Sequence, residues 1–258
     1  MGGRGLPSKM MDSNSEKRRN DRKLKNEKYH EFDDLPSGTH EYGGDGQAQV
    51  DWFNKNSNYN ELIEQMDSDE RGQFDNVWVP GSFMGGMGYR DFSAMPSWAQ
   101  EAVRTYDKYL DQSYLDKALV VSRLTTSELI LGKGNKFGTL EQLQAMEGQV
   151  VTSKANLSAG AAKQGLSIGS HLTTNPSSSW QRSSGKSVEL KIHIPSGTTG
   201  AGMWIGDSRI NSGFGREQRE FMMNRDGRYL VGKTTYDKTR DVHVVNVTWV
   251  GHYEHKYD

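Results

Sequence analysis

A carboxylate and an amide stand two residues apart at the start of an apolar run in the last third of the chain. Glu220 directly precedes the apolar run Phe221–Met223, and Gln218 stands two residues before Glu220. A second acid, Glu217, stands before both. Alternate residues of a β-strand face the same side, so a strand here places Gln218 and Glu220 on one face and Glu217 on the other. A carboxylate can stabilise positive charge that develops in a transition state, whereas an amide offers only a hydrogen-bond donor and acceptor. Glu220 and Gln218 are therefore the first candidates for chemistry, and Glu217 replaces Gln218 if the register slips by one residue.

An arginine and a serine are further candidates. Arg123 lies in the apolar, β-branched stretch Leu119–Leu124, which is typical of a buried strand. Ser158 lies in a segment rich in small residues, and Ser167 and Thr174 offer alternative hydroxyls farther along the same segment. Their types allow anion binding by the guanidinium group and hydrogen bonding by the hydroxyls.

Helical patterns precede these residues or lie between them. Apolar residues recur at helical spacing over Trp98–Leu110, which predicts an amphipathic helix. We expect a short second helix over Tyr114–Leu119, running directly into the strand that carries Arg123. Thr139 and Gln142 form a Thr-x-x-Gln capping pattern, which indicates the start of another helix.

Strand patterns dominate the later part of the chain. Residues 188–194 alternate between apolar and polar and end at a Pro-Ser-Gly turn, which predicts the clearest strand in the sequence. We expect further strands over Ala201–Ile205, Glu220–Asn224, Arg228–Val231 and Val242–Val250. Because helices come first and strands later, with no repeated strand–helix–strand unit, the fold class expected is α+β.

The first 75 residues are polar and unevenly charged. Residues 1–30 hold nine Lys and Arg against four acids, a net charge of +5, whereas residues 31–75 hold twelve acids against two bases, a net charge of −10. Such a tract buries little apolar surface to offset the entropy of ordering. We expect residues 1–75 to form an arm without fixed structure and residues 76–258 to form the catalytic domain. Residues 1–30 could instead form a basic arm that binds nucleic acid, which is a more specific hypothesis than a solvated tail.

Composition excludes several classes of function. The chain has no cysteine, so disulfides, thiolate metal sites and cysteine nucleophiles are excluded, and the net charge of −1 argues against a globally basic nucleic-acid binder. The seven histidines show no metal-ligand spacing, so no metal site is expected. No apolar run has the roughly 20 residues that a membrane span needs, and no signal peptide is recognisable. We expect a soluble, intracellular protein without a membrane partner.

Three blocks of the sequence, taken in order, resemble the Arg, Ser, Glu class of mono-ADP-ribosyltransferases. This class includes bacterial ADP-ribosylating exoenzymes and transferases attached to phage head proteins. The first block is the segment 114–123, which ends in Arg123. The third runs from a strand and Pro-x-Gly turn at 191–201 to Glu220, followed by an apolar strand. The resemblance covers roughly residues 95–250.

The second block departs from the family pattern. In the family it reads Ser-Thr-Ser after an aromatic residue, whereas this chain has Ser158-Ala159-Gly160 after Asn156 and Leu157. One hydroxyl of the block therefore remains to hydrogen-bond the catalytic carboxylate. This loss motivates an alternative in which the protein keeps the fold as a non-catalytic phage virion or interaction protein.

The resemblance implies a split β-sandwich that uses NAD as co-substrate and no metal. Arg123 and Ser158 would bind NAD, and Glu220 would stabilise the cationic sugar as the nicotinamide–ribose bond breaks, which makes the enzyme a glycosyltransferase. Phe214 and Gln218 would recognise a macromolecular acceptor, either a protein side chain or nucleic acid. Family members with Gln at the position of Gln218 modify asparagine or guanine, because an amide pairs with an amide or a base edge. The identity of the acceptor and the oligomeric state stay open.

Overall fold

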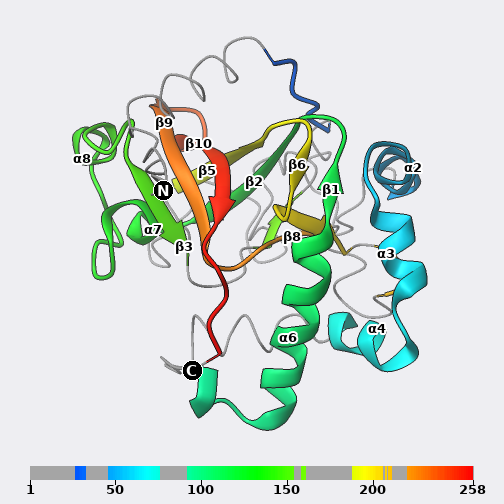
Figure 1. Cartoon of the computed structure of the whole chain (residues 1–258). Coiled ribbons are helices and arrows are strands. Elements are labelled where there is room, and N and C mark those ends of the chain that lie inside the picture. Colours follow the sequence, from blue (N-terminus) through cyan, green and yellow to red (C-terminus); the bar gives the residue numbers. More distant parts are fainter. Residues whose placement is uncertain are drawn as a thin grey trace, which may run out of the picture.

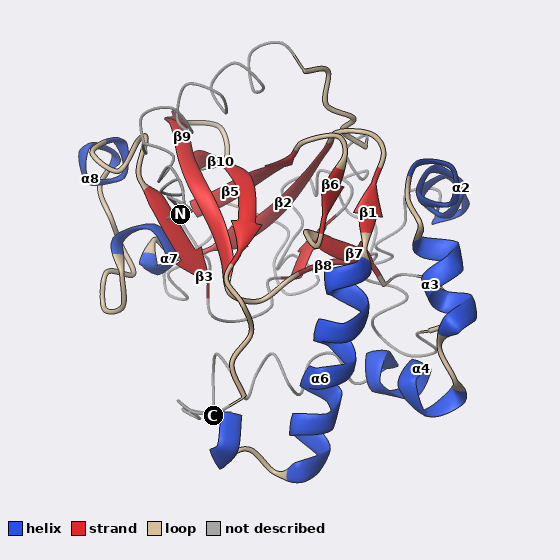
Figure 2. Cartoon of the chain, viewed as in Figure 1, coloured by secondary structure: helices blue, strands red, loops and turns tan. Residues whose placement is uncertain are grey.

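The computed structural model of the chain has an α+β fold with helices on both sides of a mixed sheet (Figures 1 and 2). The residues that it describes are 27–32, 46–75, 92–153, 158–160, 188–205, 207, 209–210 and 220–257. Of Glu220 and residues 158–160 it describes the position on the strand and not the side chain.

Eight strands form one sheet in the order β3-β9-β10-β5-β2-β4-β8-β7. Within this sheet β10 and β5 are parallel, and the other neighbouring pairs are antiparallel. The strands are β2 (Leu119–Thr125), β3 (Val150–Ser153), β4 (Ser158–Gly160), β5 (Val188–Ile194), β7 (Gly202–Trp204), β8 (Glu220–Met223), β9 (Gly227–Asp237) and β10 (Val242–His252). A separate two-stranded sheet pairs β1 (Tyr114–Leu115) with β6 (Thr198–Thr199).

The long helix α6 (Ser97–Gln112) packs by β7, and its end lies near β8 in Figure 2. It forms because its buried residues recur every three or four positions, from Ala99 through Ala102 and Tyr106 to Tyr109. It ends at Ser113, whose hydroxyl donates a hydrogen bond to the Leu110 carbonyl (2.7 Å). The expected helix over Trp98–Leu110 is thus confirmed and is slightly longer at both ends.

Two short helices cover the other end of the sheet. They are α7 (Glu128–Leu131), which packs by β3, and α8 (Leu140–Gln144), which packs by β9. The capping box expected at the start of α8 is confirmed, because Thr139 accepts from the Gln142 backbone and Gln142 accepts from the Thr139 backbone (2.9 Å). A single 3-10 turn, η1 (Phe92–Ala94), precedes α6.

Residues 46–75 form three helices, so the expectation of an arm without fixed structure is wrong for this segment. The helices are α2 (Gly46–Asn56), α3 (Tyr59–Gln65) and α4 (Ser68–Asp75). Phe53, Tyr59 and Phe74 are almost wholly buried, and Phe53 stacks on Trp204 and Phe221 of the sheet at ring-centre distances of 5.4 and 5.8 Å. A few large apolar residues, spaced for packing among many charged ones, order the segment. Most of the basic segment 1–30 lies outside the described residues.

The helix expected over Tyr114–Leu119 is also wrong, since Tyr114 and Leu115 form β1. Contacts with α3 explain the difference. The side chain of Asn58 donates to the Gln112 carbonyl and accepts from the Tyr114 backbone, both at 2.8 Å. These bonds satisfy the backbone in an extended conformation, which local helical propensity does not foresee.

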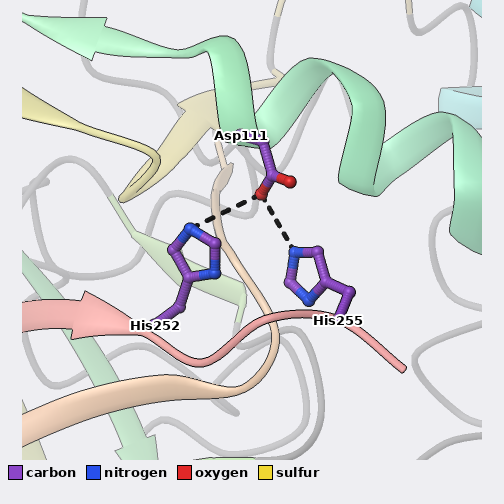
Figure 3. Close-up of side chains that lie close together, drawn as sticks. All are labelled: Asp111, His252 and His255. Carbon is purple, nitrogen blue, oxygen red and sulfur yellow. Dashed lines mark hydrogen bonds and ion pairs between the residues drawn. The ribbon is translucent and has the colours of Figure 1, made fainter.

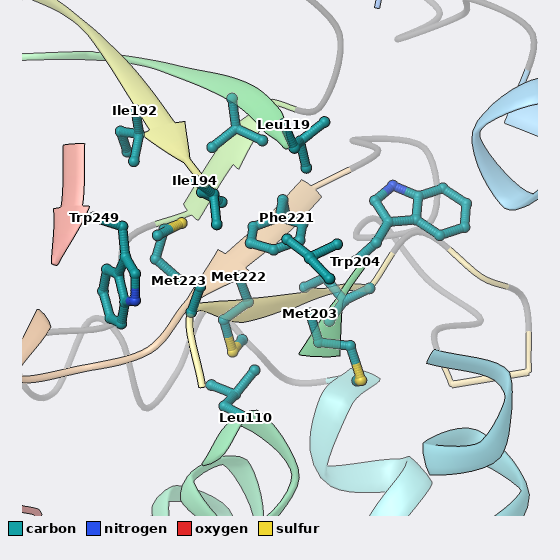
Figure 4. Packing of buried hydrophobic residues seen from close by; sticks show 14 of the residues in the cluster. Leu110, Leu119, Ile192, Ile194, Met203, Trp204, Phe221, Met222, Met223 and Trp249 are labelled. Atoms are coloured by element: carbon teal, nitrogen blue, oxygen red, sulfur yellow. The ribbon is translucent and has the colours of Figure 1, made fainter. Parts of the chain in front are cut away.

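One apolar core joins the sheet to the helices around it, and Figure 4 shows the part of it near α6 and β8. Trp204, Met203, Phe221, Met222 and Met223 are all buried. Three consecutive buried residues in β8 mean that this strand is covered on both faces, so its position is fixed by packing. Glu220 opens this strand.

The remaining strand predictions are confirmed with shifted ends. β5 covers residues 188–194 as expected, and β2 and β7 match the runs predicted for them within two residues. β9 and β10 are both longer than predicted, because they pair with each other over most of their lengths. Among the described residues there is no helix long and apolar enough to cross a membrane.

Gly202 marks a place where the packing of β7 on β8 leaves no room for a side chain. A Cβ there would overlap the Met222 carbonyl oxygen and lie 2.9 Å from the Cα of Met223. We expect Gly202→Ala to lower the free energy of unfolding by roughly 3 kcal/mol, because backbone atoms must move. Urea unfolding followed by circular dichroism measures the change.

The control is Gly72→Ala in α4, where a methyl group on the Cα would have no other atom within 4 Å. Alanine has the higher helix propensity, so this variant should gain about 1 kcal/mol. Equal effects of the two substitutions would show that β7 does not pack on β8 as described.

Candidate active site

Strand β4 joins the strand that carries Arg123 to the strand that begins with Glu220. In β2, Ser122 pairs with Gly160 of β4, and Gly160 pairs in turn with Glu220 of β8. Ser122, Gly160 and Glu220 therefore form one row across three neighbouring strands. Two strand spacings of about 4.8 Å separate the ends of this row. The hydrogen bonding of the sheet thus brings the first and third sequence blocks together through the second.

The two other predicted residues lie just off this row. Arg123 is one residue past Ser122 and pairs with Leu190 of β5, so strand alternation places it on the opposite face of the sheet from Ser122. Ser158 pairs with Met222, two residues along β8 from Glu220, or about 7 Å at the rise of a strand. The three blocks thus lie on adjacent strands, and the position opposite Glu220 is that of Gly160 rather than Ser158.

Arg123 is half-buried and acts electrostatically on Tyr229 of β9. Burial raises the pKa of the Tyr229 hydroxyl above its ordinary value, and the positive charge of Arg123 opposes that rise. A guanidinium group is suited to an anionic ligand.

Ser122 is a candidate that the sequence reasoning missed. It is a polar side chain in the apolar strand β2, it is buried, and it shares the row of Gly160 and Glu220. Its hydroxyl adds a donor and an acceptor to the site. The signal that could have found it is the polar residue itself, which interrupts the run Leu119–Val121 before Arg123.

The remaining candidates lie outside the described residues. They are Gln218, Glu217, Phe214, Ser167 and Thr174.

The start of the segment expected to recognise the acceptor is anchored to α3. Asp207 accepts a hydrogen bond from the Tyr59 hydroxyl and binds Arg209 through two nitrogens (2.9 and 3.1 Å). Arg209 also donates to the Asn60 side chain (2.7 Å). Burial opposes ionisation of Asp207, but hydrogen bonds from Arg209 and Tyr59 outweigh it and hold the pKa of the Asp207 carboxyl below its ordinary value. Residues from α3 thus position the chain that leads toward Phe214.

Comparisons with known proteins bear on the fold. No family model matches the sequence, and no curated protein matches it. Solved structures do match: C3stau2 from S. aureus, solved with NAD, has a TM-score of 0.57 and 15% identity over 86% of this chain and 98% of its own. Plx2a, an ADP-ribosyltransferase toxin from Paenibacillus larvae, has a TM-score of 0.57 and 16% identity over 83% of this chain and 100% of its own.

The Clostridium limosum C3 exoenzyme is similar to the same degree, with a TM-score of 0.58 and 13% identity over 86% of this chain and 98% of its own. The chain therefore has the fold of the bacterial ADP-ribosyltransferase exoenzymes, which confirms the fold that the three sequence blocks imply. At these identities the likeness establishes the fold and does not assign roles to residues.

The Asp207 anchor predicts a pH-dependent contribution to stability. We expect Asp207→Asn to lower the free energy of unfolding by about 2 kcal/mol at pH 7, because the charge-assisted bonds to Arg209 are lost. The folded-state pKa of Asp207 is depressed, so its contribution is present above the unfolded pKa of about 4 and is lost as the pH falls through the folded value. The difference between wild type and variant should therefore shrink in acid.

Urea unfolding at pH 7 and at progressively lower pH tests this expectation. Asp116→Asn is the matched control, since Asp116 is exposed and its nitrogen partner on Lys117 is 3.7 Å away. That control should change stability little at either pH. A difference for Asp207→Asn that stays constant into acid would rule out the charged anchor.

Proposed function

We propose that the protein is an NAD-dependent mono-ADP-ribosyltransferase that transfers ADP-ribose to a macromolecular acceptor and releases nicotinamide. The observation that carries this proposal is the row through β4, which joins the strand of Arg123 to Glu220. Two further facts support it. The fold is that of ADP-ribosylating exoenzymes, and one of the matching structures was solved with NAD.

The absence of a side chain on Gly160 suits this row to a ligand. Glycine lets a bound molecule approach the backbone closely. A ribose lying over Gly160 would have Glu220 on one side and Ser122 on the other, because these residues flank it in register. In this proposal Ser122 and Ser158 together supply the hydroxyls that the altered second block lacks.

The reaction breaks the bond between C1 of the ribose and the nicotinamide nitrogen. Nicotinamide leaves with the bonding electron pair and becomes neutral, and C1 becomes part of an oxocarbenium-like cation. The Glu220 carboxylate stabilises this cation more than it stabilises neutral ribose, which is the condition for rate acceleration. The acceptor then attacks C1 through a nitrogen or oxygen atom and loses a proton.

The sequence resemblance, and not the row through β4, gives Arg123 the role of diphosphate-binding residue in this proposal. A planar guanidinium group binds two phosphate oxygens with fixed geometry, and holding the diphosphate fixes the ribose against the carboxylate. Gln218 and Phe214 would contact the acceptor. An amide at 218 favours an acceptor that is itself an amide or a base edge, because it pairs with both donor and acceptor but does not act as a base toward a guanidinium. The phage or virion setting stays a prediction from the sequence resemblance.

Glu220→Gln tests the catalytic assignment. We expect nicotinamide release to fall at least about 100-fold, since the amide keeps a hydrogen bond but loses the charge that the cation needs. The affinity for NAD should change by no more than a few-fold. Chromatography of released nicotinamide and calorimetry of NAD binding give the two values.

Glu217→Gln is the matched control for this experiment, because it removes the same charge from a residue that a regular strand would place on the face opposite Glu220. It should retain activity within a few-fold. Loss of activity in Glu217→Gln with full activity in Glu220→Gln would move the catalytic role from Glu220 to Glu217. If the folded wild-type protein binds no NAD, the transferase proposal is wrong and the non-catalytic alternative is supported.

Arg123→Lys tests the diphosphate assignment. We expect the affinity for NAD to fall about tenfold, because lysine keeps the charge but loses the two-point contact. Affinity for nicotinamide riboside, which has no phosphate, should not change. Arg104→Lys on the exposed face of α6 is the control and should bind both ligands as wild type does. Equal NAD affinity in the Arg123 and Arg104 variants would remove Arg123 from the site.

A further inference from the structure

The end of α6 and the end of β10 bring one aspartate and two histidines together (Figure 3). The Oδ1 atom of Asp111 lies 2.9 Å from Nε2 of His255 and 3.6 Å from Nε2 of His252. The two imidazole rings stack with their centres 4.9 Å apart. Asp111 precedes His255 by 144 residues, so the sequence pattern of the histidines gave no sign of an acidic partner.

Both imidazoles present the same nitrogen to Asp111. Nδ1 of His252 lies 2.8 Å from the Tyr253 carbonyl oxygen, and Nδ1 of His255 lies 3.4 Å from the Asp226 carboxylate. Each of these partners only accepts hydrogen bonds, so each Nδ1 carries a proton. Nε2 is then the nitrogen that offers a lone pair in the neutral ring. Metal-binding histidines are oriented in the same way, by a carbonyl or carboxylate on the second ring nitrogen.

The spacing of the three atoms suits a small divalent ion. Bonds of about 2.0–2.1 Å in a tetrahedral zinc site place neighbouring ligand atoms roughly 3.3 Å apart. The two separations from Asp111, 2.9 and 3.6 Å, lie on either side of that value, and all three atoms lie within 4.8 Å of one another. An ion bound there would draw the three atoms together and turn the two nearly parallel rings toward it.

The cluster is open on one side and fixed on the other. The side chain of His255 is 5% exposed, whereas that of Asp111 is 41% exposed, which leaves room for water as a further ligand. Gly200 keeps this side clear, because a Cβ there would lie 3.1 Å from Nε2 of His252. Asn224, wholly buried, donates to Asp111 (2.7 Å) and orients its carboxylate.

Three carboxylates lie close to the imidazole of His255. Those of Asp111, Asp226 and Asp107 lie 2.9, 3.4 and 3.7 Å from its ring nitrogens. Arg225 pairs with Asp107 and Asp226 at 2.7 and 2.8 Å, whereas Asp111 faces both imidazoles. A divalent ion bound by the Nε2 atoms requires both of these nitrogens to be free of a proton.

We propose that Asp111, His252 and His255 bind a divalent transition-metal ion of the zinc type, which ties the C-terminal segment to the end of α6. Two imidazoles and one carboxylate select zinc, cobalt or nickel over magnesium and calcium, which prefer oxygen ligands. The site is structural rather than catalytic. Asn224, next to the cluster, follows the last residue of β8, whereas Glu220 opens that strand about 13 Å away at the rise of a strand.

The test is titration of chelator-treated full-length protein with zinc chloride in a calorimeter, without NAD. We expect saturable binding of one ion per chain and a rise in melting temperature with zinc, because the ion binds the folded state. Cobalt(II) should bind at the same site and give visible absorption, and magnesium should do neither.

His252→Gln and Asp111→Asn should abolish zinc binding. His243→Gln on β10, away from the cluster, is the matched control and should bind zinc as wild type does. His252 is partly exposed and its Nδ1 bonds only to the neighbouring Tyr253 carbonyl, so its variant should fold even if Asp111→Asn does not. The absence of saturable zinc binding by wild type, or equal binding by His252→Gln, would overturn the proposal. Either result leaves the proposed transferase activity untouched, because the titration contains no NAD.

Discussion

The register of β4 between β2 and β8 is the constraint on which the candidate active site depends. Arg123 and Glu220 are far apart in the sequence, and their strands are joined only through Ser158–Gly160 within the described sheet. A shift of this short strand by one residue would replace Gly160 opposite Glu220 with a residue that carries a side chain. The small residues of the second block, which weaken its likeness to the family, are thus the ones that leave the row open.

Packing on β8 holds this register in place. Phe221, Met222 and Met223 are buried against α6 and the helices of residues 46–75, with Phe53 stacked directly on Phe221. Glu220 opens the strand, and the cluster of Asp111, His252 and His255 lies beside its other end, where the Asn224 side chain donates to Asp111. The next residue, Arg225, pairs with the buried carboxylate of Asp107 (2.7 Å).

Local sequence patterns predicted the helices and strands that are determined by interactions between residues close in the sequence. The alternation over residues 188–194 and the capping pair at Thr139 give β5 and α8 as expected. Local patterns failed where contacts between distant residues determine the conformation. Hydrogen bonds with Asn58 hold the residues after α6 as a strand. A few buried aromatic residues order the charged segment 46–75. The three motif blocks could be recognised because each is contiguous. The metal cluster could not, because its aspartate and histidines meet only in the folded chain.

A crystal structure of the protein with NAD bound tests the central claim most directly. We expect the nicotinamide ribose to lie over Gly160, with the Glu220 carboxylate within hydrogen-bonding distance of its hydroxyls and the diphosphate on Arg123. Dinucleotide bound away from the β2–β4–β8 row, or a Glu220 side chain directed away from the ribose, would contradict it.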